Sequence, residues 1–500
     1  MMFDFQRKSY GKPTQDARRT TLSKSTRYIK TMLMGTSLVA RNFISLLGSN
    51  FIVQGLRFLT VALLARRLGN ELFGVYNYLI LLASYGFTIV EFGLKNLAIR
   101  EFAQKRGSGQ FLGQIFKLRL IFSGMAGIAV ILFAKQAFPA GEFLQGATYF
   151  ALSLVVDVFL VDFLVIAQER LALQAWSNMA HALTLFLGSY FLVHSPQDFL
   201  LTSEIFFVSH IVWVGLLFVS AKPLDKNNGT SSQTSMAVLV TAALPFFIAQ
   251  ILGGFQYSMD LLLLGQFHYQ SWLGDYSAAI KILSIPLGVI NALVMAIQPK
   301  LARESHNLNS PEMQTVVVNS TCLIAVILAP TIIISWLFGE QLVFWLFGSQ
   351  FIQSGQLLRP LSLALSLFCL GLAPMHGLFV SFRSRTMIKI ASANFSVSLI
   401  TVFIILILGK PQWVPWGMLI VQGFYLISAW RLYGFGIGFM ADEFYFLALP
   451  LCLLAIPLLA PSALPAWFKF LMATAGYLSG LTYAKIWRKP WFISVLSRSS

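Results

Sequence analysis

Residues 51 to 69 read FIVQGLRFLTVALLARRLG, an apolar run that a basic pair closes. A helix of about 20 such residues spans the roughly 30 Å hydrocarbon layer of a bilayer. Similar windows recur along the 500-residue chain, of which 57% is hydrophobic and 11% charged. The sequence therefore predicts an all-α polytopic membrane protein.

Hydrophobic length places fourteen spans along the chain, separated by short basic or turn-rich joints. They cover residues 43–65, 73–94, 115–134, 143–167, 175–194, 199–220, 242–265, 276–298, 315–338, 358–382, 386–409, 414–436, 444–461 and 465–486. Of the 36 Lys and Arg residues, all except Arg57 and Lys281 lie in the tails and joints or near the ends of spans, mostly on the side of the N-terminus. The positive-inside rule then predicts cytosolic N- and C-termini.

The opening stretch has a second copy. FIVQ at 51–54 recurs as FIAQ at 247–250, and Leu-Gly follows each at the same spacing, at 68–69 and 264–265. Six predicted spans separate the copies, and an even number gives both the same orientation. The repeat predicts two six-helix lobes related by an axis along the membrane normal.

The repeat and the composition together predict four parts. They are a basic cytosolic tail (1–41), an N-lobe (42–225), a C-lobe (236–440) and two additional transmembrane helices (441–490). The tail lacks the apolar centre of a cleavable signal peptide. We therefore expect the first membrane helix to direct insertion.

Prolines divide unequally between the predicted lobes. Pro245, Pro286, Pro330 and Pro374 fall inside spans of the C-lobe, whereas none interrupts a span of the N-lobe. Proline removes a backbone hydrogen bond and bends a helix. Bent helices are thus expected in the C-lobe.

Three runs resemble the signatures of bacterial polysaccharide flippases, the Wzx-type O-antigen and exopolysaccharide transporters. They are ARRLGNELFGVYNYLILLASYGFTIVEFGLKNLAIREFA (65–103), LPFFIAQILGGFQYSMDLLLLGQFHYQSWLGDYSAAIKILSIPLGVINALVMAIQPKLARE (244–304) and LFGSQFIQSGQLLRPLSLALSL (346–367). The resemblance covers about residues 40 to 435. It implies the multidrug/oligosaccharidyl-lipid/polysaccharide superfamily, with two lobes facing a cavity that opens alternately to either side.

The cargo that the resemblance implies is an oligosaccharide on a polyprenyl pyrophosphate, carried across the bacterial cell inner membrane for cell-surface or extracellular polysaccharide. A polysaccharide polymerase and a chain-length regulator would be partners. No cofactor, metal or enzymatic activity is implied. An ion-coupled exporter of small amphiphiles is the alternative, although the first span lacks the Asp or Glu expected of a drug exporter's cation site.

Arg57 lies deep in the first span. A rise of about 1.5 Å per residue puts it roughly 13 Å from Arg66 and roughly 24 Å from Arg41. A cation buried at that depth is costly and is expected to face water or an anion. Two interpretations remain, a cavity-facing anion site or a side chain that snorkels or bonds a helix carbonyl. Glu91 is a candidate ion-pair or coupling residue, but it lies at a different depth, near the cytosolic face.

Lys281 and Asp260 lie at matched depths on consecutive spans, about 8 Å below the outer surface. A structural ion pair is one interpretation, and a role for Lys281 in binding cargo or for Asp260 in coupling is the other. Asp157 and His181 also match, at about 9 Å from the cytosolic side. They are expected to form a satisfied pair or a proton relay.

Other classes of function fit the sequence less well. The net charge of +17 would indicate nucleic-acid binding in a soluble protein, but here it follows membrane topology. A membrane glycosyltransferase or polymerase would need acids, His or Arg clustered in an outer joint, and the longest such joint, 339–359, has no such cluster. The three cysteines lie far apart in apolar segments and are expected to be core residues.

Overall fold

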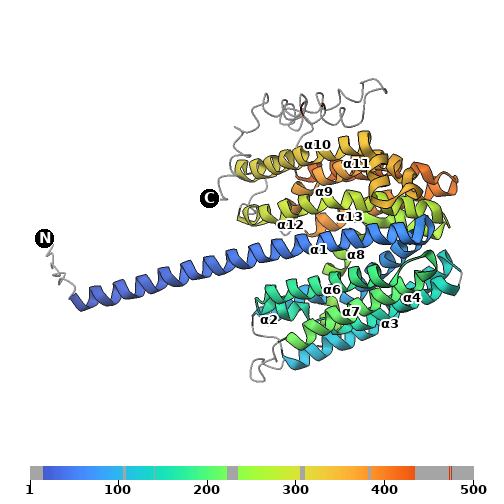
Figure 1. Cartoon of the computed structure of the whole chain (residues 1–500). Helices are drawn as coiled ribbons and strands as arrows, with labels where there is room; N and C mark the ends of the chain where they lie inside the picture. The colour runs from blue at the N-terminus through green and yellow to red at the C-terminus, as the bar shows by residue number, and fades with distance from the viewer. Residues whose placement is uncertain are drawn as a thin grey trace.

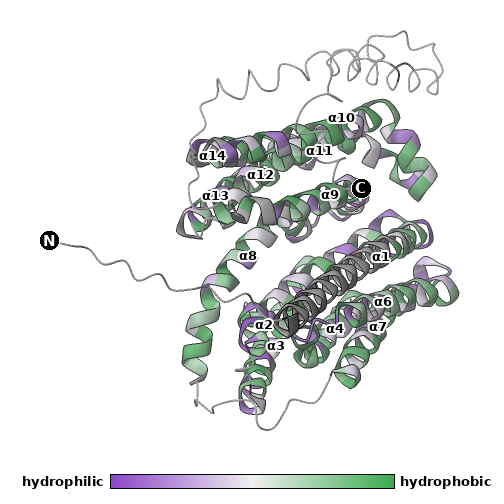
Figure 2. Ribbon diagram, turned by 90° about the vertical axis from the view of Figure 1, so that its left-hand side faces the viewer, coloured by the Kyte–Doolittle hydropathy of each residue, from purple (hydrophilic) through white to green (hydrophobic). Residues whose placement is uncertain are grey.

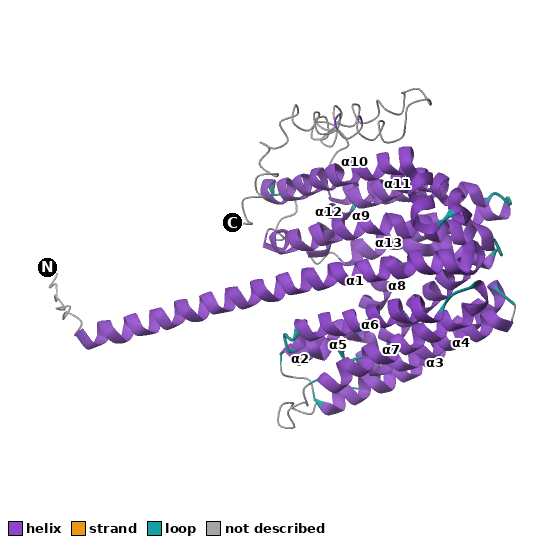
Figure 3. Cartoon of the chain, viewed as in Figure 1, coloured by secondary structure: helices purple, strands orange, loops and turns teal. Residues whose placement is uncertain are grey.

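The computed structural model describes residues 15–104, 108–139, 141–221, 235–303, 310–380 and 384–433, together with 472 and 475. Over these residues the chain is helical and has no strand (Figure 3). Nine helical segments in this part are long and apolar enough to cross a membrane. The prediction of an all-α polytopic membrane protein is therefore confirmed.

The first helix is α1 (Gln15–Glu91), which joins the first two predicted spans across a kink at Gly69. Gly69 has φ 78°, in the left-handed region that favours glycine, so the Leu-Gly word of the repeat marks a turn between two helices. The chain continues through α2 (Leu94–Ala103), α3 (Gly109–Ala137), α4 (Gly141–Val156), η1 (Asp157–Phe159), α5 (Asp162–Ala167), α6 (Leu171–Leu192), η2 (Pro196–Asp198) and α7 (Phe199–Ser220).

The second half begins with α8. Its elements are α8 (Met236–Gln266), α9 (Gln270–Arg303), α10 (Pro311–Phe347), η3 (Ser349–Phe351), α11 (Ile352–Leu370), α12 (Leu372–Val380), α13 (Ser384–Ile407), η4 (Pro411–Trp413) and α14 (Val414–Tyr433). Each of the first twelve predicted spans coincides with one or two helices. The last two, 444–461 and 465–486, lie outside the described residues.

The helices gather into two groups that meet along α1 (Figure 1). The first group comprises α1 to α7, and the second comprises α9 to α14. Helix α8 leans across from one group to the other (Figure 2). Most of the joint between 225 and 236 lies outside the described residues, and the lobe boundaries stay a prediction.

Helix irregularities occur in both halves of the chain. Pro245 and Pro330 lie inside α8 and α10, and α8 is also non-helical at Ser258. The fourth span is broken between α4 and α5 around η1, with no proline involved. The proline pattern therefore missed a break in the first group.

The helix bundle has two ends. The Gly69 end contains the turn after the first span, and the Glu91 end contains the C-terminus of α1. At the Gly69 end an aromatic core joins the groups, since the ring of Phe73 lies 6.3 Å from that of Phe347 and 5.5 Å from that of Phe351. The predicted outer joint 339–359 lies here and is largely helical.

Candidate functional site

The two groups meet closely at the Gly69 end because α1 and α9 present glycines to each other. A Cβ on Gly74 would lie 2.6 Å from the backbone nitrogen of Gly274, and a Cβ on Gly274 would clash with the side chain and carbonyl of Asn70. No residue with a side chain fits either position without moving the helices apart. The repeat thus places a glycine of each copy in one contact.

Hydrogen bonds around Asp275 reinforce this contact. The side-chain amide of Asn70 donates to Asp275 Oδ2 at 2.9 Å, across the groups. The backbone nitrogen and hydroxyl of Ser354 donate to Asp275 Oδ1 at 3.1 and 2.6 Å. A buried carboxylate therefore ties α1, α9 and α11 together.

The basic pair that closes the opening stretch also binds backbone at this end. Arg66 Nε donates to the carbonyl of Leu346 at 3.0 Å, near the C-terminus of α10. Arg67 donates to the carbonyls of Ser189 and Tyr190, near the C-terminus of α6, at 3.0 and 2.7 Å. Cations suit the free carbonyls of helix C-termini. The pair links α1 to one helix of each group.

Arg57 lies in α1 where the two groups meet, about 18 Å along the helix from the kink at Gly69. Its side chain is exposed. Its charge acts on His181 and His210 of the first group and on Lys281 of the second. Among the described residues Arg57 has no ion-pair partner. An unpaired cation with neighbours from both groups is able to bind an anion there.

Asp260 and Lys281 do not form an ion pair in the structure. Asp260 instead accepts hydrogen bonds from the hydroxyl of Tyr276 and from the backbone nitrogen of Leu261. Lys281 follows Tyr276 by five residues, which turns it about 140° around α9 from the Asp260 side. Equal depth in the membrane therefore did not bring the two side chains together, because Lys281 lies on a different side of α9 from Tyr276 and Asp260.

Asp260 lines a cavity of about 110 Å³ inside the second group. Gln422 of α14 lies on the same cavity, and its Oε1 atom has no hydrogen-bond partner among the described residues. A buried carboxylate beside a mostly apolar cavity is suited to bind a proton, because its charged form is poorly solvated there. Asp260 therefore stays a candidate coupling residue.

Asp157 and His181 also do not form the predicted pair. Asp157 begins η1, where the break between α4 and α5 carries it toward Arg119 of α3 rather than toward α6. Asp157 Oδ1 has no hydrogen-bond partner in the described part of the chain. The sequence could not place Asp157 because no proline or glycine announces the break.

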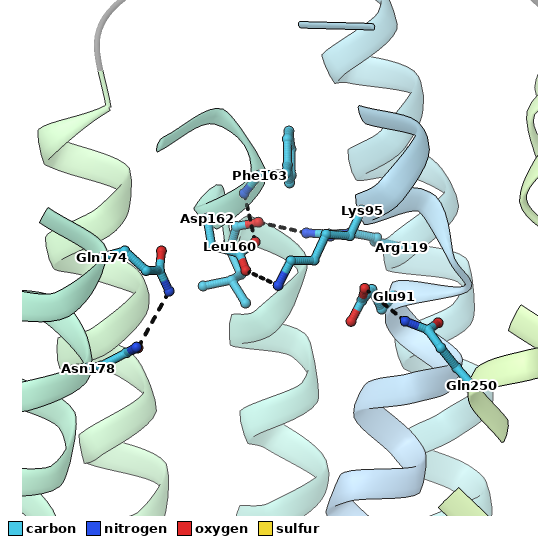
Figure 4. Close-up of polar contacts among 9 residues, drawn as sticks. All are labelled: Glu91, Lys95, Arg119, Leu160, Asp162, Phe163, Gln174, Asn178 and Gln250. Atoms are coloured by element: carbon cyan, nitrogen blue, oxygen red, sulfur yellow. Dashed lines mark hydrogen bonds and ion pairs between the residues drawn. The ribbon is translucent and has the colours of Figure 1, made fainter. Parts of the chain in front are cut away.

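The sequence analysis did not single out Arg119, which lies near the start of the predicted span 115–134. It is only 2% exposed inside the first group, and its Nη1 donates to the carbonyl of Leu160 at 2.7 Å (Figure 4). The guanidinium also lies over the ring of Phe163 at 5.2 Å. The break at η1 leaves the Leu160 carbonyl free of the helix, which explains why an arginine is buried opposite it.

Beside Arg119, Lys95 of α2 forms an ion pair with Asp162 of α5, with Nζ and Oδ2 2.6 Å apart (Figure 4). Asp162 is 3% exposed and also accepts a hydrogen bond from the backbone nitrogen of Phe163. The pair fixes α2 to the first group. Lys95 and Asp162 are far apart in the sequence, and no local pattern indicates that they pair.

Glu91 lies at the end of α1 away from Arg57, as its depth predicts. Gln250 of α8 donates to Glu91 Oε1 at 3.4 Å, a long hydrogen bond between α1 and α8 (Figure 4). Next to it, the Phe92 ring stacks between Phe122 of α3 and Phe247 of α8, with centroids 4.4 and 4.3 Å apart. Glu91 therefore belongs to the contact between α8 and the first group.

Sequence comparisons give a consistent assignment. A family model described as polysaccharide biosynthesis protein matches residues 39–305. The probable low-salt glycan biosynthesis flippase Agl15 of Haloferax volcanii is 24% identical over 289 residues. That alignment covers 56% of this chain and 59% of the relative, so it leaves more than a third of the relative unmatched.

Solved structures share the fold. Lipid II flippase MurJ in an inward closed conformation matches with a TM-score of 0.72 and 12% identity, over 89% of this chain and 100% of that chain. A mutant of the Vibrio cholerae MATE transporter VcmN matches with a TM-score of 0.54 and 13% identity, over 80% of this chain and 96% of that chain. At such identities the similarity concerns the fold alone.

Proposed function

The chain belongs to the polysaccharide biosynthesis protein family, and from this premise we propose that it is a flippase for a polyprenyl-pyrophosphate-linked oligosaccharide. It moves this cargo across the bacterial cytoplasmic membrane by alternating access, for surface or extracellular polysaccharide. One observation carries the proposal: the exposed cation Arg57 has ionisable neighbours in both helix groups, His181 in the first and Lys281 in the second. Such a residue stays in contact with cargo whichever group moves.

Arg57 binds the pyrophosphate in this proposal. A guanidinium stays charged when it is dehydrated and donates two parallel hydrogen bonds to phosphate oxygens. Lys281 adds a second cation near the same place, from the second group. The glycan passes between the groups while the prenyl chain stays in lipid, where its methylenes cost nothing. A polymerase and a chain-length regulator receive the product.

The closed junction at the Gly69 end supports alternating access. It is built from a glycine contact, a buried carboxylate and an aromatic core, all of which must separate together for cargo to leave there. We propose that this end is the outer one and that both termini are cytosolic. A reporter active only outside the cytosol should then be silent when fused at Asp225 and active at His268, and reversed activities would reverse the orientation.

An ion-coupled exporter of amphiphiles remains the alternative on the same fold. The first half of α1 has no acidic residue between 43 and 65, where the drug-exporting branch is expected to have one. Arg57 occupies that helix instead, and a cation there repels cationic amphiphiles. The charge therefore favours an anionic cargo.

Replacing Arg57 tests the proposal. Arg57→Ala should insert at normal abundance yet lose export, with lipid-linked intermediates accumulating in the membrane, while Arg57→Lys keeps part of the activity because it retains the charge. Arg100→Ala is the matched control, since Arg100 is an exposed arginine in α2. Membrane abundance, surface polysaccharide and lipid extracts are measured together. Full export by Arg57→Ala would refute the anion site, and loss of the protein itself would make Arg57 structural.

A further inference from the structure

Two histidines meet in the interior of the first group. His181 lies in the middle of α6 and His210 in the middle of α7, each about 15 Å from its helix ends. Their ring centroids are 4.9 Å apart, edge to face. Trp213 contacts both, at 5.4 and 5.9 Å. His181 and His210 are called the histidine pair below, and Trp213 is the tryptophan that contacts both.

The pair is buried but incompletely hydrogen-bonded. His181 is 7% exposed and His210 is 9% exposed. His210 Nδ1 bonds the carbonyl of Phe206 at 3.1 Å, whereas His181 Nε2 and Trp213 Nε1 have no partner among the described residues. Buried polar atoms are normally paired, and an ionisable group in the middle of a membrane helix usually serves a function. The unpaired nitrogen is available for a proton.

Arg57 lies near the pair because α1 packs along α6, where Arg67 bonds the carbonyl of Ser189. Counted from that contact, Arg57 lies about 15 Å along α1 and His181 about 12 Å along α6. The other polar groups on the packed elements are engaged elsewhere. Tyr149 of α4 interacts with Glu204 of α7, Asp157 of η1 with Arg119, Asp162 of α5 with Lys95, and Asp198 of η2 with His194 and Ser195. Burial disfavours a charge on the pair, and the charge of Arg57 and of whatever binds Arg57 adds to that effect or offsets it.

We propose that His181 and His210 form a proton-binding site that is linked to the anion site at Arg57. This rests on the proposed function, in which Arg57 binds the pyrophosphate of the cargo. Two imidazolium rings at this distance repel each other, so the pair takes up one proton. An anion at Arg57 offsets the guanidinium charge and raises the proton affinity of the pair. By reciprocity, the protonated pair raises the affinity for the anion. The flippase thus binds a proton together with its cargo.

The experiment is a pH titration of the purified full chain between pH 4 and 9. Trp213 fluorescence, obtained as the difference from Trp213→Phe, reports protonation because a charged imidazole beside an indole changes its emission. We expect one titration step in the native protein and none in His181→Gln or His210→Gln. His194→Gln is the matched control, since His194 is exposed near η2, and it should keep the step. Persistence of the step in both pair variants, or its absence from the native protein, would overturn the proposal.

The link to Arg57 is tested with inorganic pyrophosphate as the probe. Saturating pyrophosphate should move the midpoint upward by about one pH unit. Arg57→Gln should move it upward without the probe and abolish the response to it. Pyrophosphate should also bind about tenfold more tightly below the midpoint than above it, as reciprocity requires. A midpoint unchanged by Arg57→Gln would overturn the link.

These outcomes separate the proton site from the proposed function. A titration that responds to Arg57→Gln but not to pyrophosphate would support the histidine site and refute the anion role of Arg57. A chain that exports glycan through Arg57 but shows no titration of the pair would refute the histidine site alone.

Discussion

The two ends of the bundle are held by different kinds of contact. At the Gly69 end the strong polar bonds cross between the helix groups, as those of Asn70 to Asp275 and of Arg66 to α10 do. At the Glu91 end the short ion pair of Lys95 and Asp162 lies inside the first group. In the described part of the chain, the hydrogen bond that reaches α8 there from α1 is the long one from Gln250 to Glu91, and the remaining contact with α8 is apolar packing that includes the Phe92 stack. The Gly69 end is therefore the end at which the two helix groups are held together in this structure.

Helix α8 is also less buried than α1. In the most apolar window of its segment Met236–Phe255, 11% of the residues are buried, against 67% for the segment Ile52–Glu91 of α1. This half of α8 is little buried, and the backbone is irregular just after it, at Ser258. Weakly packed elements with an irregular backbone are those that move most easily. The comparison predicts that α8 moves at the Glu91 end while the Gly69 end stays closed.

Filling the glycine contact should have the largest effect. Gly274→Ala introduces a methyl group against Asn70, and the overlap is with backbone, so about 3 kcal/mol or more of closed-state stability is lost. Polysaccharide export should fall by more than about tenfold. Gly288→Ala on the same helix is the control, because nothing lies within 4 Å of that position. Equal export by the two variants would mean that the Gly69 end is not a close junction.

Removing the buried carboxylate should rank second. Asp275→Ala deletes three hydrogen bonds that join α1, α9 and α11, at a cost of about 3 kcal/mol. The thermal midpoint of the purified protein and its export should both fall. Asp275→Asn should retain much of each, since Asn70 Oδ1 is free to accept from the new amide. A variant Asp275→Ala with native stability would contradict the comparison.

Breaking the ion pair at the Glu91 end should affect folding but not gating. Lys95→Met leaves Asp162 buried without its partner, which costs about 2 kcal/mol because Lys95 itself is partly exposed. Membrane abundance should decrease, with export per molecule unchanged, and adding Asp162→Asn should restore abundance. Arg100→Met removes only an exposed pair with Glu101 and serves as the control. Reduced export per molecule would show that this pair takes part in the gate.

The contact between Glu91 and Gln250 should matter least. Gln250→Leu removes a hydrogen bond of 3.4 Å and should change abundance and export by less than about twofold. Both quantities are measured beside Asp275→Ala in one set of membranes. A loss as large as that of Asp275→Ala would show that the two ends are held equally.

The sequence alone determined the helices and their depths. Hydrophobic length located twelve spans that the structure describes as helices, because burying about 20 apolar residues in lipid is decided within each segment. The repeat identified Leu-Gly words at equivalent turns, and counting residues placed Glu91 at the opposite end from Gly69. Rise along one helix is a local property, so these predictions needed no neighbour.

The tertiary structure decided which side chains meet. Asp260 and Lys281 share a depth, yet the hydroxyl that donates a hydrogen bond to the Asp260 carboxylate is that of Tyr276, because Tyr276 lies on the side of α9 that faces α8. Arg119 is buried because the break between α4 and α5, which no sequence pattern indicated, leaves the Leu160 carbonyl free to accept its hydrogen bond. His181 contacts His210 rather than Asp157, because the same break turns Asp157 away from α6. Depth follows from one helix, whereas the direction of a side chain around its helix has meaning only once the neighbouring helices are packed.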